Sequence, residues 1–513
     1  MSGRALPVLD VAALNSAPPT GRPARPALDD ALAEFATEDV ALPAFHVWTL
    51  GCQMNRSDAE EMAGALLAAG CAEAPSLEAA ELIVINSCAI REAAEQKVIG
   101  RMGHLGRLKA ANAGLRVVLT GCSVRENNRA VLARRYPAVD LFLTPDEEPE
   151  LTARLGLAGA TAPGLLAHQG GLREAGVAPS RGSAISAWLP IIYGCDKTCT
   201  YCIVPFSRGP ERSRPFDQVL AEAHALAGAG YREVTLLGQN VNSYGHDLPP
   251  ELRFSDVHRQ REIGRRLDLD GRPDIAALLR AIDAIRTADG VPAIPRLRFV
   301  TSHPWDLGDR LIAAMAESAS VCEHLHLPVQ SGDDAVLRRM GRQYTVDAYL
   351  RLVERLRAAV PGIVLTTDVI VGFCGETEAQ FERTLELLRA VRFEQVFAAA
   401  FSVRPGTPAA RLPDDVPRAE KKRRLAALLD VQEEIGLEAN RRWVGRTTEV
   451  LVDQLRPAPS HGHDGAQPAG PRVAGRNRHN KLVHLTGGAE LLGRLVDVRV
   501  EHAGPYALVG RLA

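Results

Sequence analysis

The sequence predicts an α/β protein built from three folded parts: an N-terminal parallel α/β domain, a central open (β/α)6 partial barrel and a small C-terminal β-barrel. Two observations predict the first two parts. Short apolar runs rich in β-branched residues alternate with helical segments, and glycine or polar residues follow each run. A third observation, the alternation of apolar and polar residues near the end of the chain, is typical of antiparallel strands in a small barrel.

The totals limit the class of protein. Lys and Arg (60) nearly balance Asp and Glu (62), so any surface that binds a polyanion must be local. Nine cysteines are too few for a disulfide scaffold in 513 residues, and their grouping indicates metal binding in a reducing compartment. Without an apolar stretch of membrane-spanning length or a signal peptide, the chain is expected to be cytoplasmic, with no membrane partner. Residues 1–43, rich in Ala and Pro, are expected to be a disordered extension.

The N-terminal domain, residues 44–160, contains three similar units in which a predicted strand is followed by a cysteine. Right-handed crossovers place the carboxyl ends of parallel strands at one edge of a sheet, so we expect the three cysteines to converge there. Helices are expected between the strands, at Ser57–Ala69 and Glu92–Leu108. The strands and their cysteines are Phe45–Leu50 with Cys52, Leu82–Ile85 with Cys88, and Arg116–Leu119 with Cys122.

The central domain, residues 181–438, shows six strand signals separated by helical segments. This pattern predicts an open barrel with functional groups just after each strand. We expect an insertion loop at 246–274, where the chain is polar and lacks an apolar pattern. The predicted strands are Trp188–Tyr193, Glu233–Leu237, Arg296–Thr301, His324–Val329, Val364–Val371 and Gln395–Phe401, and the predicted helices include Phe216–Ala229, Ile275–Ala288 and Val346–Val360.

The loop after the first of these strands carries Cys195, Cys199 and Cys202. Thiolate is the ligand that iron–sulfur centres select, and this spacing lets three thiolates bind one face of a cubane cluster. One of four irons then lacks a protein ligand and is open to the amino and carboxylate groups of S-adenosylmethionine. A zinc knuckle is the alternative, but structural zinc needs four ligands and the next cysteine is Cys322.

The triad Cys52, Cys88 and Cys122 has a simpler alternative, because free cysteine is often a small buried residue at the end of a core strand. Each of these cysteines, however, follows a strand and adjoins Gly, Asn or Ser. We therefore favour a second cluster, again with one open iron. The other three cysteines are expected to be structural: Cys71, Cys322 and Cys374.

The final part, residues 441–513, carries 11 Lys and Arg against 6 Asp and Glu, so it is basic although the whole chain is not. Its predicted strands form a small barrel: Thr448–Leu455, Lys481–Leu485, Gly493–Glu501 and Tyr506–Leu512.

Five motifs from residue 45 to the end of the chain resemble the radical methylthiotransferases: Gly51-Cys-Gln-Met-Asn55, Asn86-Ser-Cys-Ala-Ile-Arg-Glu92, Gly194-Cys-Asp-Lys-Thr-Cys-Thr-Tyr-Cys-Ile-Val-Pro205, His326-Leu-Pro-Val-Gln-Ser-Gly332 and Gly475-Arg-Asn-Arg-His-Asn-Lys481. Within this family the sequence is most similar to the enzymes that act on N6-isopentenyladenosine at position 37 of tRNA, next to the anticodon. The resemblance implies a methylthiotransferase domain, a radical S-adenosylmethionine core and an RNA-binding TRAM barrel.

The resemblance also implies cofactors and partners. It implies two 4Fe-4S clusters and two uses of S-adenosylmethionine: one molecule methylates sulfur at the auxiliary cluster, and another yields a 5′-deoxyadenosyl radical that abstracts hydrogen from C2 of the adenine. The cofactor must perform this step, because acid–base chemistry cannot activate such a C–H bond. The expected partners are tRNA carrying isopentenyladenosine, a flavodoxin- or ferredoxin-like electron donor and a sulfur donor, and the chain is expected to act as a monomer.

By position in the motifs, Gly238, Gln239, Asn240, Ser302 and Gln330 are candidates to cradle S-adenosylmethionine, although ordinary loop polarity would explain them as well. Arg476, Arg478 and Lys481 are candidates to contact tRNA phosphates, although a solvated charged face is the alternative.

Three departures from the family stand out: Cys374 occupies a position where proline is expected, and the 246–274 insertion and the 456–472 loop are long. The rival enzymes act on threonylcarbamoyladenosine in tRNA or on an aspartate of a ribosomal protein. The Gln-Met-Asn after Cys52 and the basic 476–481 segment favour the isopentenyl substrate by resemblance alone. A different class, a non-catalytic iron–sulfur RNA-binding protein, predicts no cleavage of S-adenosylmethionine.

Overall fold

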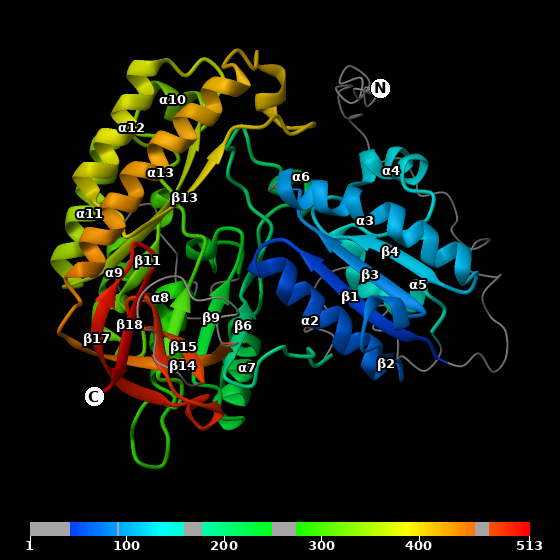
Figure 1. Cartoon of the computed structure of the whole chain (residues 1–513), viewed down its shortest axis with the longest axis horizontal. Helices are drawn as coiled ribbons and strands as arrows, with labels where there is room; N and C mark the ends of the chain where they lie inside the picture. The colour runs from blue at the N-terminus through cyan, green and yellow to red at the C-terminus, as the bar shows by residue number, and fades with distance from the viewer. Residues whose placement is uncertain (1–41, 90–91, 158–176, 249–272, 457–470) are drawn as a thin grey trace. The chain divides into compact units, whose positions relative to one another are not determined.

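The computed structural model describes residues 42–89, 92–157, 177–248, 273–456 and 471–513. The described residues fall into two compact units: those of unit 1 lie within Met1–Ser180, Lys197–Gly209 and Ser402–Pro413, and those of unit 2 lie within Arg181–Asp196, Pro210–Phe401 and Asp414–Ala513 (Figure 1). The N-terminal extension, most of the 246–274 insertion and nearly all of the 456–472 loop lie outside the described residues. In the described part of the chain, every helix is too short or too polar to cross a bilayer.

Unit 1 is built on a parallel sheet with the strand order β2-β1-β3-β4-β5. Its three central strands confirm the prediction: β1 (Ala44–Leu50), β3 (Leu82–Ser87) and β4 (Arg116–Thr120). Two short strands, β2 (Ala72–Glu73) and β5 (Leu141–Phe142), extend the sheet at its edges.

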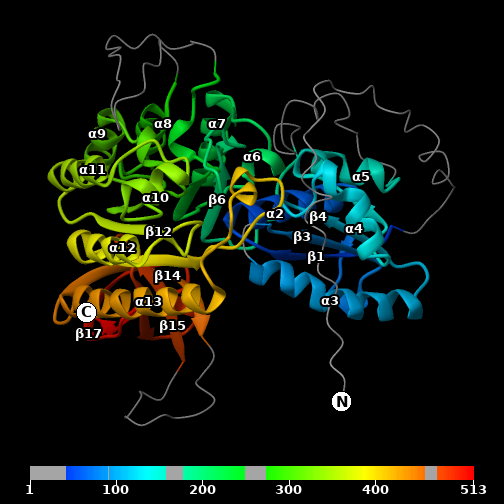
Figure 2. The same cartoon turned by 90° about the horizontal axis from the view of Figure 1, so that it is seen from above.

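Helices cover both faces of this sheet. One face packs with α2 (Gln53–Ala68) and α5 (Leu151–Arg154), and the other packs with α3 (Glu92–Ala111). Figure 2 shows α3 on the face of the sheet away from α2. Every residue of β3 is buried, as a parallel strand between two helical layers requires. A further short helix, α4 (Arg129–Arg135), precedes β5.

The predicted start of the first helix, Ser57, is wrong because α2 begins at Gln53, directly after Cys52. Asn55 explains the earlier start. Its side-chain oxygen accepts a hydrogen bond from the backbone N–H of Cys52 at 3.3 Å, which caps the first turn. Cys52 is therefore fixed at a helix N-terminus and not in a free loop.

The core of unit 2 consists of two three-stranded parallel sheets, β6-β9-β10 and β11-β12-β13. A parallel bridge between Leu297 and Val321 links them, and among the described residues no ladder joins β13 back to β6. The predicted open (β/α)6 arrangement is therefore confirmed. The strands are β6 (Ser186–Pro190), β9 (Glu233–Leu237), β10 (Arg296–Phe299), β11 (His324–His326), β12 (Val364–Val371) and β13 (Gln395–Ala400).

Two of the three helices with predicted ranges, α7 (Phe216–Gly228) and α11 (Val346–Ala359), lie at the predicted positions, whereas α8 (Ile275–Asp283) ends earlier than the predicted Ala288. The chain after α8 turns back on itself instead of continuing the helix. The backbone N–H of Gly290 donates to Thr287 O in this turn, and Arg286 pairs with Pro292. The other helices are α9 (Asp309–Glu317), α10 (Asp334–Arg339), α12 (Glu378–Val391) and α13 (Arg418–Arg441).

The C-terminal part of unit 2 is a closed barrel with the strand order β14-β15-β16-β18-β17. Four of its strands were predicted, but β15 (Arg472–Asn477) was not. Gly475, Arg476 and Asn477 give this strand a low β-propensity. Gly475 is nevertheless required, because a Cβ there would lie 1.9 Å from Leu451 O on the neighbouring strand. The predicted strands correspond to β14 (Thr447–Arg456), β16 (Leu482–Thr486), β17 (Leu495–Ala503) and β18 (Ala507–Leu512).

Candidate functional site

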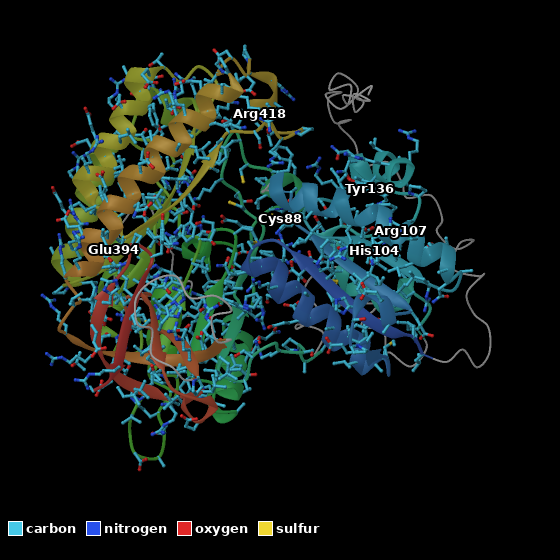
Figure 3. The ribbon with its side chains drawn as sticks, in the orientation of Figure 1. Cys88, His104, Arg107, Tyr136, Glu394 and Arg418 are labelled. Carbon is cyan, nitrogen blue, oxygen red and sulfur yellow. The ribbon has the colours of Figure 1, made fainter. Side chains whose placement is uncertain are left out.

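Cys52, Cys88 and Cys122 lie at the carboxyl edge of the unit 1 sheet, after the adjacent strands β1, β3 and β4. Cys88, labelled in Figure 3, is buried, as is Cys122, whereas Cys52 is partly exposed. The charges of Cys88 and Cys52 both act on the Cys122 thiol, so the three side chains are close enough to interact. The predicted convergence of the three cysteines is therefore present in the structure.

Two buried asparagines hold the loops that carry Cys52 and Cys88. Asn55 Nδ2 donates to Asn86 Oδ1 at 2.9 Å, and Asn86 Nδ2 donates to the backbone oxygen of Asn55 at 2.8 Å. Gly121, next to Cys122, has φ +90°, and a Cβ there would lie 2.4 Å from Asn86 Oδ1. Asn55 and Asn86, which were quoted only as motif residues, are thus positioning residues for the thiols.

The donor set of this edge fits an iron–sulfur cluster, because a cubane distributes three thiolates over three irons. The hydroxyl oxygens of Ser87 and Ser123, adjacent to Cys88 and Cys122, are buried without a hydrogen-bond partner. Three thiols with unpaired buried hydroxyls beside them are a donor set suited to an iron–sulfur cluster.

Around Cys122 the structure reveals residues that the sequence did not single out. Arg208 Nε donates to Cys122 Sγ at 3.1 Å, and its Nη2 lies 2.5 Å from Asp58 Oδ2. Burial raises the pKa of the Cys122 thiol to about 11, although the Arg208 charge acts in the opposite direction. Burial, followed by the charge of Asp58, also raises the pKa of Glu148, whose carboxylate bonds to Thr120 Oγ1.

Cys195, Cys199 and Cys202 lie in one loop after β7 (Ile192–Tyr193), a two-residue strand. The boundary of the two units passes through this loop, so Cys195 belongs to unit 2 whereas Cys199 and Cys202 belong to unit 1. Within unit 1, the backbone N–H of Cys202 donates to Cys199 O at 3.1 Å, which forms a tight turn between the two ligand candidates.

The predicted S-adenosylmethionine residues lie after β9, β10 and β11 in unit 2, at the carboxyl ends of the strands. Polar side-chain atoms of four of them are buried without a partner: both amide atoms of Gln239, Oδ1 of Asn240, Oγ of Ser302 and Oε1 of Gln330. Buried polar atoms without partners are costly, and a ligand rich in amino, carboxylate and hydroxyl groups would satisfy them. These residues therefore fit S-adenosylmethionine.

Two residues near this rim have a strained backbone. Thr301 has φ +70° and Gln330 has φ +73°, in a region that non-glycine residues rarely adopt. Such strain persists at functional sites when the surrounding structure enforces it. Gly238 has a different explanation, because a Cβ there would lie 2.3 Å from Ile192 Cγ2. Its lack of a side chain is thus required for packing.

Replacing Gln330 with Gly tests the amide and the strain separately. The glycine variant is expected to be at least as stable as the parent, because it relieves strain of about 1 kcal/mol. It should bind S-adenosylmethionine about 3- to 10-fold more weakly, because one hydrogen-bonding group is lost. Urea unfolding and equilibrium dialysis measure the two effects. Gln330→Ala, which keeps the strain, is the control, and undiminished binding by Gln330→Gly would contradict the assignment.

The predicted RNA-binding residues lie where the barrel packs on the core of unit 2. The Arg478 guanidinium contacts both carboxylate oxygens of Glu323 at 2.8 Å. Lys481, 9% exposed, forms an ion pair with Glu394, which is labelled in Figure 3. Arg476 Nη1 donates to Asn480 O at 2.8 Å. All three cations therefore have partners within the protein, and their contact with tRNA phosphates stays a prediction.

Two family models match parts of this chain. Residues 189–388 match the Radical SAM superfamily, which implies a 4Fe-4S cluster and S-adenosylmethionine. Residues 44–144 match a family described as "Uncharacterized protein family UPF0004". Among solved structures, the radical S-adenosylmethionine methyltransferase TsrM from Kitasatospora setae aligns with a TM-score of 0.49 and 14% identity, covering 78% of each chain.

Curated relatives match nearly the whole chain, and all of those named here are called tRNA-2-methylthio-N(6)-dimethylallyladenosine synthase. The protein from Geobacillus kaustophilus is 41% identical over 91% of this chain and 82% of its own length. That from Carboxydothermus hydrogenoformans is 40% identical over 92% of this chain and 100% of its own length. That from Roseiflexus is 41% identical over 91% and 89%, respectively. This chain belongs to the tRNA-2-methylthio-N(6)-dimethylallyladenosine synthase family.

Proposed function

We propose that this chain methylthiolates C2 of N6-dimethylallyladenosine (isopentenyladenosine) at position 37 of tRNA, by radical S-adenosylmethionine chemistry. The observation that carries the proposal is the second set of three thiols, at the carboxyl edge of the unit 1 sheet. Radical generation needs only Cys195, Cys199 and Cys202. A further three-thiol site is what a reaction that also transfers sulfur would require.

The residues have separate tasks in this proposal. When bound at Cys195, Cys199 and Cys202, a 4Fe-4S cluster supplies the electron that cleaves S-adenosylmethionine. The unpaired polar atoms of Gln239, Asn240, Ser302 and Gln330 orient the bound S-adenosylmethionine. Cys52, Cys88 and Cys122 hold the auxiliary cluster. The target adenine must leave its stack to reach these groups, as in other enzymes that modify bases.

The proposal includes domains and partners. Residues 44–160 act as the methylthiotransferase domain, 181–438 as the radical core and 441–513 as the TRAM domain, which binds tRNA. A flavodoxin- or ferredoxin-like protein supplies electrons, and a separate donor supplies sulfur. The chain acts in the cytoplasm, as a monomer, on tRNA that already carries isopentenyladenosine.

The decisive experiment incubates reconstituted protein with S-adenosylmethionine, reductant and tRNA carrying isopentenyladenosine, and then analyses the nucleosides by mass. We expect 5′-deoxyadenosine together with the 2-methylthio nucleoside. Cleavage without a methylthio product would refute the substrate assignment, and tRNA carrying threonylcarbamoyladenosine or the ribosomal protein would then be assayed. Absence of 5′-deoxyadenosine would instead favour a non-catalytic iron–sulfur RNA-binding protein.

A further inference from the structure

One arginine of unit 1 is directed at a candidate cluster ligand. Arg208 is only 6% exposed, although a guanidinium is costly to bury. Both of its terminal nitrogens face Asp58, with Nη2 at 2.5 Å from Oδ2 and Nη1 at 3.5 Å from Oδ1. Asp58 is itself buried at the first turns of α2. The remaining N–H group, Nε, is not used on the carboxylate but donates to Cys122 Sγ at 3.1 Å.

This arrangement distinguishes the thiols of the site. Cys122 receives a hydrogen bond from a permanent cation, whereas Cys52 Sγ lies 3.5 Å from Asn55 Oδ1, a neutral acceptor. Charge-assisted hydrogen bonds are about twice as strong as neutral ones. Arg208 therefore meets Cys122 as a charged donor, in a buried setting where electrostatic effects are large.

Arg208 also links two parts of the chain. It lies six residues after Cys202, immediately beyond α6 (Val204–Ser207), in the segment of unit 1 that carries Cys199 and Cys202. Asp58 and Cys122 come from the sheet and helix layers of the same unit. The contact thus joins the segment that carries two radical-cluster ligands to a ligand of the auxiliary site.

We propose that Arg208, held by Asp58, is a positioning residue that binds the Cys122 thiolate and raises the reduction potential of the auxiliary cluster. This inference rests on the proposed function, since it requires a cluster at Cys52, Cys88 and Cys122. Reduction adds negative charge to a cluster, and both a nearby cation and hydrogen bonds to its sulfur ligands favour the reduced form. Removing the cation therefore lowers the potential, and removing the Asp58 charge raises it.

The test uses the full chain with Cys195, Cys199 and Cys202 changed to Ala, so that only the auxiliary cluster can form. After anaerobic reconstitution, iron content and a redox titration followed by electron paramagnetic resonance are measured. Arg208→Met is expected to shift the midpoint potential to a more negative value, Asp58→Asn to a less negative one, and Arg208→Lys less than Arg208→Met. The control is Arg154→Met, which removes an arginine of unit 1 paired with Glu147 and Glu150, and it should leave the potential unchanged.

An unchanged potential in Arg208→Met with iron retained would overturn the inference. If Arg208→Met loses its iron, Arg208→Lys is compared with it. Iron retained by Arg208→Lys, together with equal unfolding midpoints of the two iron-free variants, would support the role of the positive charge. Iron lost equally in both variants would make Arg208 a structural residue and overturn the inference. Absence of iron from the parent protein would refute the auxiliary cluster itself, so that failure is recognised before any variant is compared.

Discussion

Replacing Cys52, Cys88 and Cys122 together with Ala is expected to abolish methylthiolation of tRNA while cleavage of S-adenosylmethionine to 5′-deoxyadenosine continues. The two sets of cysteines have separate roles, because the cluster that cleaves S-adenosylmethionine needs only the thiols of the 195–202 loop. Iron content should fall by one cluster, about four atoms per chain. Iron assay, with quantification of 5′-deoxyadenosine and the modified nucleoside in one reaction mixture, measures all three effects.

The reciprocal variant, with Cys195, Cys199 and Cys202 changed to Ala, should lose both products while it keeps about four irons. Cys71→Ala is the matched control, because Cys71 is a buried cysteine of unit 1 that belongs to neither set, and both products should remain. If the Cys52, Cys88 and Cys122 variant kept its full iron content, the second cluster would be refuted. If that variant no longer formed 5′-deoxyadenosine, the separate roles of the two cysteine sets would be contradicted.

The sequence predicted the sheets well because their signals are local. Leu82–Ile85 is a continuous β-branched and leucine run, and such runs are typical of strands buried on both faces, as β3 is. The convergence of Cys52, Cys88 and Cys122 followed from the handedness of crossovers, which needs no knowledge of side-chain packing. The fold class and the convergence of these three cysteines were therefore predictable from pattern and topology, whereas their role as cluster ligands stays a prediction.

The errors occurred where distant or special contacts decide the structure. The start of α2 depends on a cap made by Asn55, and β15 is a strand despite Gly475 because Leu451 O approaches it closely. The pairing of Arg208 with Asp58 spans 150 residues of sequence. Local periodicity contains no information about contacts between residues far apart in the sequence, so the sequence alone could not assign a role to Arg208.

The basic motif of the barrel, residues 476–481, also has contacts that the sequence alone does not predict. Sequence alone gives Arg478 and Lys481 a positive charge, which suggests phosphate binding. Their partners Glu323 and Glu394 lie in the sheet region of unit 2, more than 80 residues earlier in the chain. The structure thus places these cations where the barrel docks on the core.

Arg298→Met is expected to lower the free energy of unfolding of unit 2 by about 3–5 kcal/mol, because it removes a buried cation from its pair with a largely shielded carboxylate. Arg298 lies on β10, where its Nε contacts Glu233 Oε2 at 2.7 Å. Its terminal nitrogens donate to the carbonyls of Asn477 at 2.8 Å and Arg478 at 3.0 Å, at the end of β15. The substitution therefore leaves the partly buried Glu233 carboxylate without its partner and removes two hydrogen bonds that join the barrel to the core.

Weaker docking of the barrel on the core distinguishes the expected effect of Arg298→Met from a general loss of stability. Urea unfolding measures the loss of stability, and limited proteolysis should show faster cleavage between α13 and β14, near Gly445, under conditions in which the core persists. Arg280→Met is the matched control: its pair with Glu317 is exposed, so about 0–1 kcal/mol should be lost and the cleavage pattern should not change. Equal stability losses in the two variants would mean that Arg298 is not a docking residue. Because Arg298 binds backbone carbonyls and not side chains of the basic motif, weaker tRNA binding by Arg298→Met would indicate that barrel position, and not only barrel charge, sets affinity for RNA.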